Sequence, residues 1–282
     1  MYTTTLDVNK NYDNEILEHG VIHIKNEKNI LFTPKDFLKF AKTAIPGVVG
    51  ALGDKKEEGN YGSEGSPAVV RLAIDGFASN VGIEWHADST IFKECSMAVC
   101  YNKNNCQVVP TRFINNRKVL KEIFNDDFEY LKQIKIVWDL KLKYPGRQMA
   151  DNGLTDKNKF GWFWDYPVYC NDYLTIQDQN RSPLSFHPVT KEPFLNLSTN
   201  VIEEIHNDTK GVYSAVIEKL RQYSPEVEDK FVEESPWTDG DFIIWDNCQV
   251  IHSRRSWSHL VESSQDPKRE LWRVNMIKPL RK

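Results

Sequence analysis

The distribution of hydrophobic positions predicts a chain built from many short β-strands and few helices. Short runs rich in apolar, β-branched and aromatic residues are bounded by polar or turn-forming segments, which is typical of strands. The runs cover residues 21–24, 69–74, 96–101, 108–114, 194–197, 242–245 and 269–277. Their number favours a layered β-structure over a helical bundle.

Three stretches have helical spacing instead. They cover residues 33–45, 115–134 and 209–223. The first has a complete start signal, because Thr33 can cap the helix, Pro34 suits its first turn and Asp36 places an acid near its N-terminus. The second is expected to break near residues 125–127, where the chain reads Asn-Asp-Asp.

These elements predict a mostly β fold with helical additions, arranged as a sandwich or barrel. No glycine-rich loop joins a strand to a helix in a βαβ pattern, so a nucleotide-binding fold is poorly supported. Without an internal repeat or a convincing linker, residues 1–282 are expected to form a single domain. Residues 144–182 have no steady period and many aromatics, which favours an active-site lid, with a place in the core as the alternative.

The composition limits the classes of partner that the protein is expected to bind. The 36 Lys and Arg residues against 40 Asp and Glu residues give a net charge of −4, so we expect no nucleic-acid or membrane partner. Five cysteines without a C-x-x-C pair indicate free thiols in a reducing compartment. No signal peptide or apolar run of membrane-spanning length is visible, and a cytoplasmic location is therefore expected.

The strongest candidate for chemistry is the His-x-Asp pair His86 and Asp88. On extended backbone, residues i and i+2 leave the same face, so an imidazole and a carboxylate can converge on one ion. The pattern alone is weak, because His206 and Asp208 form a second His-x-Asp pair in a polar region read as helical.

Downstream residues strengthen the first pair. His252 follows the predicted strand 242–245, and two histidines with one carboxylate form the facial triad of non-haem Fe(II) oxygenases. A structural zinc site would need a fourth ligand, which the cysteines are not spaced to supply. A Cys248 nucleophile paired with His252 is a weaker alternative, since no orienting third group is evident.

At this point the chain resembles the taurine dioxygenase-like (TauD/TfdA-like) family of Fe(II)/2-oxoglutarate-dependent dioxygenases. The resemblance covers most of the chain and rests on several motifs in the family's order. They are Glu18 to Ile22 followed by Thr33-Pro34 and Phe37 to Ala41, Trp85-His86-Ala87-Asp88, Thr111-x-Phe113-x-Asn115, His187 to Asn196, and Trp237-x-x-Gly240-Asp241 through His252.

The resemblance implies a double-stranded β-helix (jelly-roll, cupin-like) core that holds Fe(II) through His86, Asp88 and His252. It also implies that 2-oxoglutarate chelates the metal and reaches Arg269, that Thr111 adds a hydroxyl donor, and that O2 takes the remaining position. A guanidinium binds a carboxylate bidentately, which suits Arg269. The expected reaction is oxidation of a small molecule coupled to conversion of 2-oxoglutarate to succinate and CO2.

Hydroxylation is the default outcome, while desaturation or oxidative cyclisation stays open. Related halogenases replace the carboxylate ligand with a small residue, so Asp88 argues against halide transfer. A non-catalytic jelly-roll binding protein is the alternative of another class, but such a protein would be expected to lack a metal ligand.

Arg273 and Glu84 are the candidates for substrate binding. On a strand, Arg273 points the same way as Arg269, so one arginine can hold the cosubstrate and the other the substrate, and their roles could be exchanged. In taurine enzymes the second arginine of such a pair binds the sulfonate, which implies an acidic group on the substrate here. Glu84 shares the His86 face if that stretch is extended, and it could meet an amine. A carboxylate-bearing substrate, such as an amino-acid derivative, is therefore expected.

Overall fold

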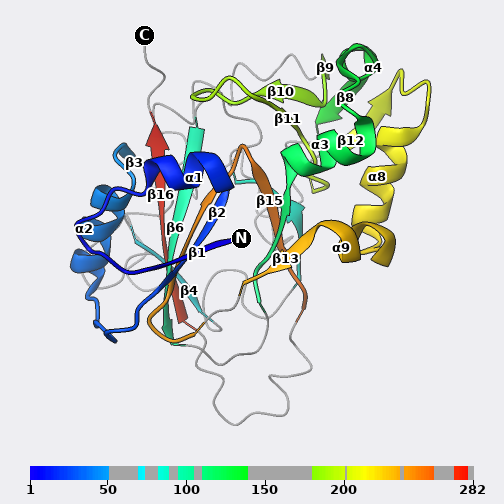
Figure 1. Ribbon diagram of the computed structural model, residues 1–282. Helices are drawn as coiled ribbons and strands as arrows, with labels where there is room; N and C mark the ends of the chain where they lie inside the picture. The colour runs from blue at the N-terminus through cyan, green and yellow to red at the C-terminus, as the bar shows by residue number, and fades with distance from the viewer. Residues whose placement is uncertain are drawn as a thin grey trace, which may run out of the picture.

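Two β-sheets, one large and one small, make up the centre of the computed structural model (Figure 1). The structure describes residues 1–50, 69–73, 82–88, 95–104, 110–138, 180–200, 202–235, 238–256 and 270–278. Arg269 and all but the last few residues of the expected lid at 144–182 lie outside these described residues. None of the described helices is long and apolar enough to cross a membrane.

The larger sheet has seven strands in the order β1-β2-β14-β6-β16-β3, with β4 also paired to β16. Its strands are β1 (Tyr2–Thr5), β2 (Val21–Lys25), β3 (Val48–Gly50), β4 (Val70–Ala73), β6 (Cys95–Asn104), β14 (Phe242–Asp246) and β16 (Glu270–Lys278). Only β1 and β2 pair in parallel, and the other pairs are antiparallel. Strands from both ends of the chain therefore lie side by side at its centre.

The smaller sheet has four antiparallel strands in the order β13-β7-β15-β5. They are β5 (Ile83–His86), β7 (Arg112–Asn115), β13 (Val232–Glu234) and β15 (Val250–Arg254). The two sheets meet face to face in one buried cluster, in which the ring of Phe113 on β7 lies 5.6 Å from that of Trp245 on β14. The space between the sheets is therefore a packed interior.

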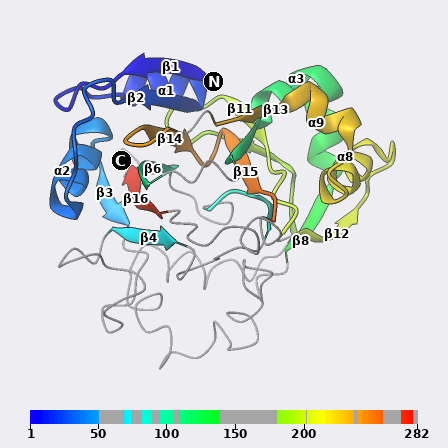
Figure 2. The same ribbon diagram turned by 90° about the horizontal axis from the view of Figure 1, so that it is seen from below.

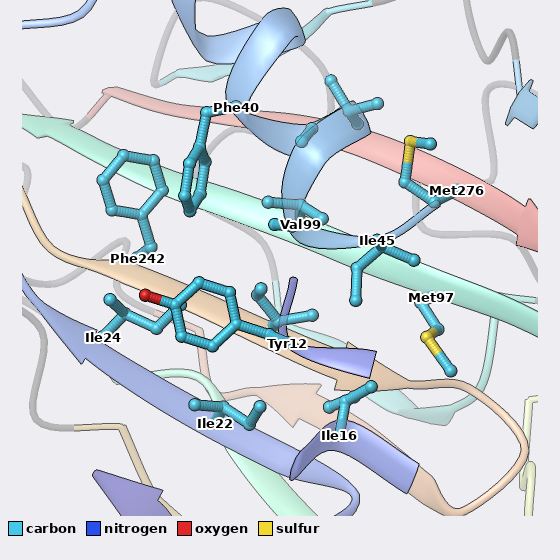
Figure 3. Packing of buried hydrophobic residues seen from close by; sticks show 14 of the residues in the cluster. Tyr12, Ile16, Ile22, Ile24, Phe40, Ile45, Met97, Val99, Phe242 and Met276 are labelled. Atoms are coloured by element: carbon cyan, nitrogen blue, oxygen red, sulfur yellow. The ribbon is translucent and has the colours of Figure 1, made fainter. Parts of the chain in front are cut away.

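Two N-terminal helices cover the outer face of the larger sheet. These are α1 (Asp13–His19) and α2 (Pro34–Ala44), and Figure 2 shows them on the side of that sheet away from α8. Alternation along β14 directs Phe242 and Ile244 toward these helices and Ile243 and Trp245 toward the smaller sheet. Figure 3 shows this helix-facing core, in which Phe40 of α2 lies 4.6 Å from Phe242 between ring centroids. Each fully buried side chain of this kind contributes about 1.5–3 kcal/mol to folding.

Four more helices of the described residues cover the outer face of the smaller sheet. They are α3 (Asn116–Phe124), α4 (Phe128–Gln133), α8 (Val212–Arg221) and α9 (Pro225–Phe231). Two small sheets accompany them, formed by β8 (Lys135–Trp138), β9 (Asn180–Arg181) and β12 (Ile202–His206), and by β10 (Leu184–Phe186) and β11 (Pro193–Leu195). Trp85, Ile114 and Ile251 of the smaller sheet are buried in the core under these helices.

A buried ion pair fastens α9 to the smaller sheet. Arg112 on β7 donates to Glu228 on α9 at 2.7 Å, and Arg255 donates to the same carboxylate at 2.8 Å. The guanidinium of Arg112 also lies 5.3 Å from the ring of Trp85. Burial would raise the pKa of Glu228, but Arg112 and Arg255 together outweigh it, and the pKa lies below its usual value. The strand that ends at His86 is thus held from its outer side.

Most of the expected elements are confirmed within the described residues. Helix α2 has the predicted start, since the Thr33 hydroxyl and the Asp36 carboxylate form a reciprocal capping box. The stretch 115–134 divides into α3 and α4 at the predicted place, because Asn125 and Asp126 take left-handed backbone with φ of 48° and 56°. Helix α9 was not predicted, and it begins at Pro225, where the missing N–H of proline costs nothing.

The turn that leads into β14 depends on Gly240. Its φ is +85°, and a Cβ there would lie 2.9 Å from Nδ2 of Asn26, whose amide is bonded to both backbone groups of Ile30. We expect Gly240→Ala to lower the free energy of unfolding by about 2–3 kcal/mol, from left-handed strain and the disrupted Asn26 bonds. Urea denaturation followed by circular dichroism measures the change.

Gly211 supplies the control for this prediction. Its φ is +65°, yet nothing lies within 4 Å of the position that a Cβ would take. Gly211→Ala should therefore cost only the backbone strain, about 1 kcal/mol. Equal losses in the two variants would show that the contact with Asn26 has no energetic weight.

Candidate metal centre

Strand pairing brings the two predicted histidine ligands together. His86 is the last residue of β5 and His252 lies within β15, and the antiparallel register places them directly opposite each other. Their ring centroids are 4.1 Å apart. Two residues far apart in the sequence therefore present their imidazoles at one point between the sheets.

Asp88 completes the group from just beyond the end of β5. One carboxylate oxygen, Oδ1, lies 3.8 Å from Nε2 of His86, and the other, Oδ2, lies 3.8 Å from Nε2 of His252. One ligand atom from each residue can be chosen so that all three lie within 4.8 Å of one another. The three residues singled out in the sequence are thus brought together by the fold.

The tautomer of His86 leaves one of its ring nitrogens able to bind a cation. Nδ1 of His86 lies 2.7 Å from the backbone oxygen of Glu84, and a carbonyl can only accept, so Nδ1 carries the proton. The Nε2 lone pair of His86 therefore points toward Asp88, as metal-ligating histidines require. Two imidazole nitrogens and a carboxylate oxygen suit Fe(II), so the residues present fit the expected metal.

Burial and charge set the protonation states of the three groups. Burial lowers the pKa of His86 and, with help from the neighbouring His86, lowers that of His252 well below the usual value, although Asp88 opposes both shifts. Burial alone would raise the pKa of Asp88, but the pKa is lowered, and the charge and hydrogen bond of Arg273 oppose the effect of burial. The site therefore consists of two neutral imidazoles and one carboxylate, the ligand forms that bind metal.

Arg273 is the charge partner of Asp88. It lies on β16 of the opposite sheet, and its Nη1 is 3.2 Å from Oδ2 and 3.4 Å from Oδ1 of the carboxylate. Thr111 immediately precedes β7, two residues before Phe113, whose ring centroid is 6.3 Å from that of His252. Of the predicted binding residues, Arg273 therefore lies on a strand beside the metal centre, and Thr111 lies directly before another.

Glu84 does not follow the simple alternation assumed in the sequence analysis. The register between β5 and β15 shifts between the pairs His252–His86 and Arg254–Ile83, so a bulge interrupts the strand at Glu84. Its side chain is exposed, and its charge contributes to a raised pKa of Tyr223. Its backbone oxygen orients His86, whereas a role for its carboxylate in substrate binding stays a prediction.

The other His-x-Asp pair has a structural role. His206 ends β12, so its assignment to a helical region was wrong, and its Nε2 lies 2.9 Å from Glu204 on the surface. Asn207 leaves the strand in left-handed backbone with a φ of 59°. Asp208 then accepts 2.7 Å bonds from the backbone and hydroxyl of Ser214, which holds the start of α8.

A second cluster among the described residues joins His187, Asp246 and Cys248. Nε2 of His187 lies 2.8 Å from Asp246, while its Nδ1 accepts from the backbone N–H groups of Val189 and Thr190 at 3.2 and 3.0 Å. Both ring nitrogens are thus committed to hydrogen bonds. This histidine can neither ligate a metal nor act as a base for Cys248 without losing them. The alternative of a Cys248 nucleophile paired with His252 concerns a different histidine and stays a prediction.

Two buried residues near the centre had not been singled out from the sequence. Asn247 follows Trp245 and Asp246, and its Oδ1 accepts from the backbone N–H of Asp88 at 3.3 Å. Asn275 lies two residues beyond Arg273 on the same face of β16, and neither atom of its carboxamide has a partner among the described residues. Strand alternation from Arg273 could have indicated Asn275, but no local pattern marks Asn247.

Comparison with known proteins agrees with this site. The model of the taurine catabolism dioxygenase TauD, TfdA family matches residues 6–275. The chain belongs to this family. Membership confirms the resemblance stated above and makes the protein an oxidoreductase, a dioxygenase that uses Fe(II), 2-oxoglutarate and O2.

Solved structures support the fold of the enzyme. A taurine dioxygenase from Burkholderia xenovorans shares 13% identity, with 99% of this chain and 87% of that chain covered and a TM-score of 0.64. AAD-2, in complex with Mn(II) and N-oxalylglycine, shares 14% identity over 99% and 94% of the two chains, with a TM-score of 0.62. PvcB from Pseudomonas aeruginosa shares 12% identity over 94% and 78%, with a TM-score of 0.57. No curated protein matches the sequence.

The cluster of His86, Asp88 and His252 and the cluster of His187, Asp246 and Cys248 are expected to differ in metal affinity. We expect the enzyme to bind about one Co(II), a stand-in for Fe(II), at the first cluster only, because the nitrogens of His187 are already hydrogen-bonded. His252→Ala should weaken binding by more than the roughly 10–100-fold that follows loss of an outer partner. Cys248→Ser should bind Co(II) as tightly as the wild type. Isothermal titration that gave the opposite ranking would assign the metal to the second cluster.

Proposed function

We propose that the enzyme oxidises an unactivated C–H bond of a small molecule while 2-oxoglutarate is decarboxylated to succinate and CO2, with hydroxylation as the default outcome. The observation that carries the proposal is the buried group of His86, Asp88 and His252, with ligand atoms within 4.8 Å of one another. We further propose that the two facing sheets correspond to the double-stranded β-helix core of the family.

The three side chains are proposed to hold Fe(II) on one face. Bound Fe(II) with chelated 2-oxoglutarate supplies the capacity to activate O2, and three protein ligands leave positions for both. His86 and His252 bind through Nε2 as neutral imidazoles. Asp88 provides the anionic ligand and fills the position that a halide would need, which favours oxygenation over halogenation.

Arg269 and Thr111 are proposed to bind the distal carboxylate of 2-oxoglutarate. A guanidinium offers paired donors to a carboxylate, and a hydroxyl can add a third. Thr111 has a suitable location, because it adjoins the strand whose Phe113 faces His252. Arg269 directly precedes β16, which carries Arg273 at the metal carboxylate.

Arg273 is proposed to bind a carboxylate of the substrate, with Glu84 as a candidate partner for an amine. The support is its position, because its side chain is largely buried and its guanidinium contacts the proposed metal ligand Asp88. A substrate anion could share this cation with Asp88, which places the substrate next to the metal. A substrate screen that yielded only uncharged, apolar compounds would contradict this assignment.

Desaturation or oxidative cyclisation is the second candidate outcome. A second structure of PvcB, which resembles this chain with a TM-score of 0.58, describes that protein as an Fe, alpha-ketoglutarate dependent oxygenase from an isonitrile synthetic pathway. A biosynthetic substrate is therefore a reasonable alternative. Analysis of the product by mass spectrometry separates the gain of an oxygen atom from the loss of two hydrogens.

The reaction can be tested before the substrate is known. Purified enzyme with Fe(II), 2-oxoglutarate and O2 should release succinate slowly without a substrate. His86→Ala should reduce this rate to the level of free Fe(II), because the metal loses a ligand. Chromatographic measurement of succinate decides the matter, and undiminished release in the variant would count against the proposed centre.

The two arginines can be separated by their effect on the cosubstrate. Arg269→Ala should raise the 2-oxoglutarate concentration for half-maximal succinate release by at least about tenfold, since a charged hydrogen bond contributes roughly 1.5–3 kcal/mol. Arg273→Ala should change it far less. The reverse ranking would mean that Arg273 holds the cosubstrate and Arg269 the substrate.

A further inference from the structure

The three proposed metal ligands are not equally constrained by the fold. His86 and His252 face each other across a paired strand register, so the sheet fixes both. Asp88 lies two residues beyond the end of β5, in a turn without a strand partner. Its position must therefore depend on contacts that its own segment makes with the rest of the interior.

Hydrogen bonds to other segments of the chain hold the turn that carries Asp88. The backbone N–H of Ala87 donates to the hydroxyl of Ser198 at 3.0 Å, and the backbone oxygen of Trp85 accepts from the backbone of Thr199 at 2.8 Å. At Asp88 itself, the backbone N–H donates to Oδ1 of Asn247 at 3.3 Å. The side chain of Asn247 thus contacts the main chain of Asp88, whose carboxylate is the proposed metal ligand.

Asn247 is itself firmly placed. Its Oδ1 also accepts from the indole Nε1 of Trp245 at 2.9 Å, and its backbone N–H donates to the backbone oxygen of Ser96 at 3.0 Å. Its Nδ2 donates to the hydroxyl of Ser96 at 3.4 Å. An indole N–H and a backbone N–H can only donate, so the carboxamide oxygen, not its nitrogen, must face Trp245 and Asp88.

Trp245 also contacts His252, the second histidine of the proposed site. The ring of Trp245 lies 4.9 Å from the imidazole of His252 between centroids. The indole that orients Asn247 therefore also packs against a proposed ligand. Asp88, Asn247, Trp245 and His252 form a continuous path that connects the ligand on the turn to a ligand on the strand.

We propose that Asn247 is a positioning residue that keeps Asp88 in its metal-binding place. It acts by fixing the main chain of Asp88 relative to Trp245 and His252, and it opposes displacement of the carboxylate toward Arg273, whose Nη1 lies 3.2 Å from Oδ2. Loss of the Asn247 oxygen would take the acceptor away from the buried indole N–H of Trp245 and the partly buried backbone N–H of Asp88, and the cost of leaving them unbonded would favour movement of the turn. The inference rests on the proposed role of Asp88 as a ligand.

The test compares two buried amides of the same turn. Asn247→Leu removes the acceptor and keeps the branched shape of the side chain. Gln249→Leu is the matched control, because Gln249 bonds to the backbone oxygens of Ile16 and Leu17 and to Asp246, away from the metal. Co(II) affinity is measured by titration, the ligand-field absorption of bound Co(II) reports its geometry, and Tm of the metal-free protein reports stability.

Both leucine variants should lower Tm, but only Asn247→Leu should weaken Co(II) binding, by about 10–100-fold, and change the Co(II) spectrum. Equal Co(II) affinities in Asn247→Leu and the wild type, or equal losses in the two variants, would overturn the proposal. Wild-type protein that bound no Co(II) would instead count against the metal centre itself, so the two failures are distinguishable.

A further pair of variants isolates the acceptor oxygen. Asn247→Asp retains an oxygen at this position and should keep the Co(II) dissociation constant within about threefold of wild type. A loss as large as that of Asn247→Leu would contradict the proposed bond. Should the leucine variant not fold, Asn247→Ala removes the acceptor without added bulk and takes its place in the comparison.

Discussion

The pairing of β5 with β15 is the constraint on which the metal centre depends. It places His86 opposite His252 and leaves Asp88 free to turn back toward both imidazoles. As consecutive residues of a strand, Trp85 enters the core beneath α8 while His86 faces the interior, and the bulge in this pair interrupts the alternation that would place Glu84 on the face of His86. A shift of the register by one residue would send the ligands to opposite faces of the sheet.

The centre also depends on a balance of charge. A carboxylate this deeply buried is costly unless it is paired, and Arg273 supplies the partner from the opposite sheet. Burial keeps the imidazoles neutral, so Asp88 and Arg273 are the charged groups in direct contact at this point. Fe(II) bound at the proposed site would compensate part of the charge of Asp88. The guanidinium of Arg273 would then be less engaged with that carboxylate and freer for the anionic substrate group proposed above.

Local patterns in the sequence were sufficient for some of this picture. The strand at 242–245, the start of α2 and the His-x-Asp pair depend on neighbouring residues, and the structure confirms the first two and brings His86 and Asp88 together. Glu84 shows the limit of such reasoning, because a bulge is set by the partner strand and cannot be seen in residues 82–88 alone. Likewise, the location of Asn247 beneath Asp88 arises from contacts across most of the chain, and no spacing rule reports it.

The most direct test of this account is anaerobic addition of Fe(II) to the wild-type enzyme in the presence of 2-oxoglutarate, followed by visible absorption. Chelation of 2-oxoglutarate by protein-bound Fe(II) produces a metal-to-ligand charge-transfer band. If His86, Asp88 and His252 hold the metal with positions left for the cosubstrate, the band should saturate at about one Fe(II) per chain and be lost in Asp88→Ala. Absence of the band in the wild type, or an unchanged band in Asp88→Ala, would contradict the central claim.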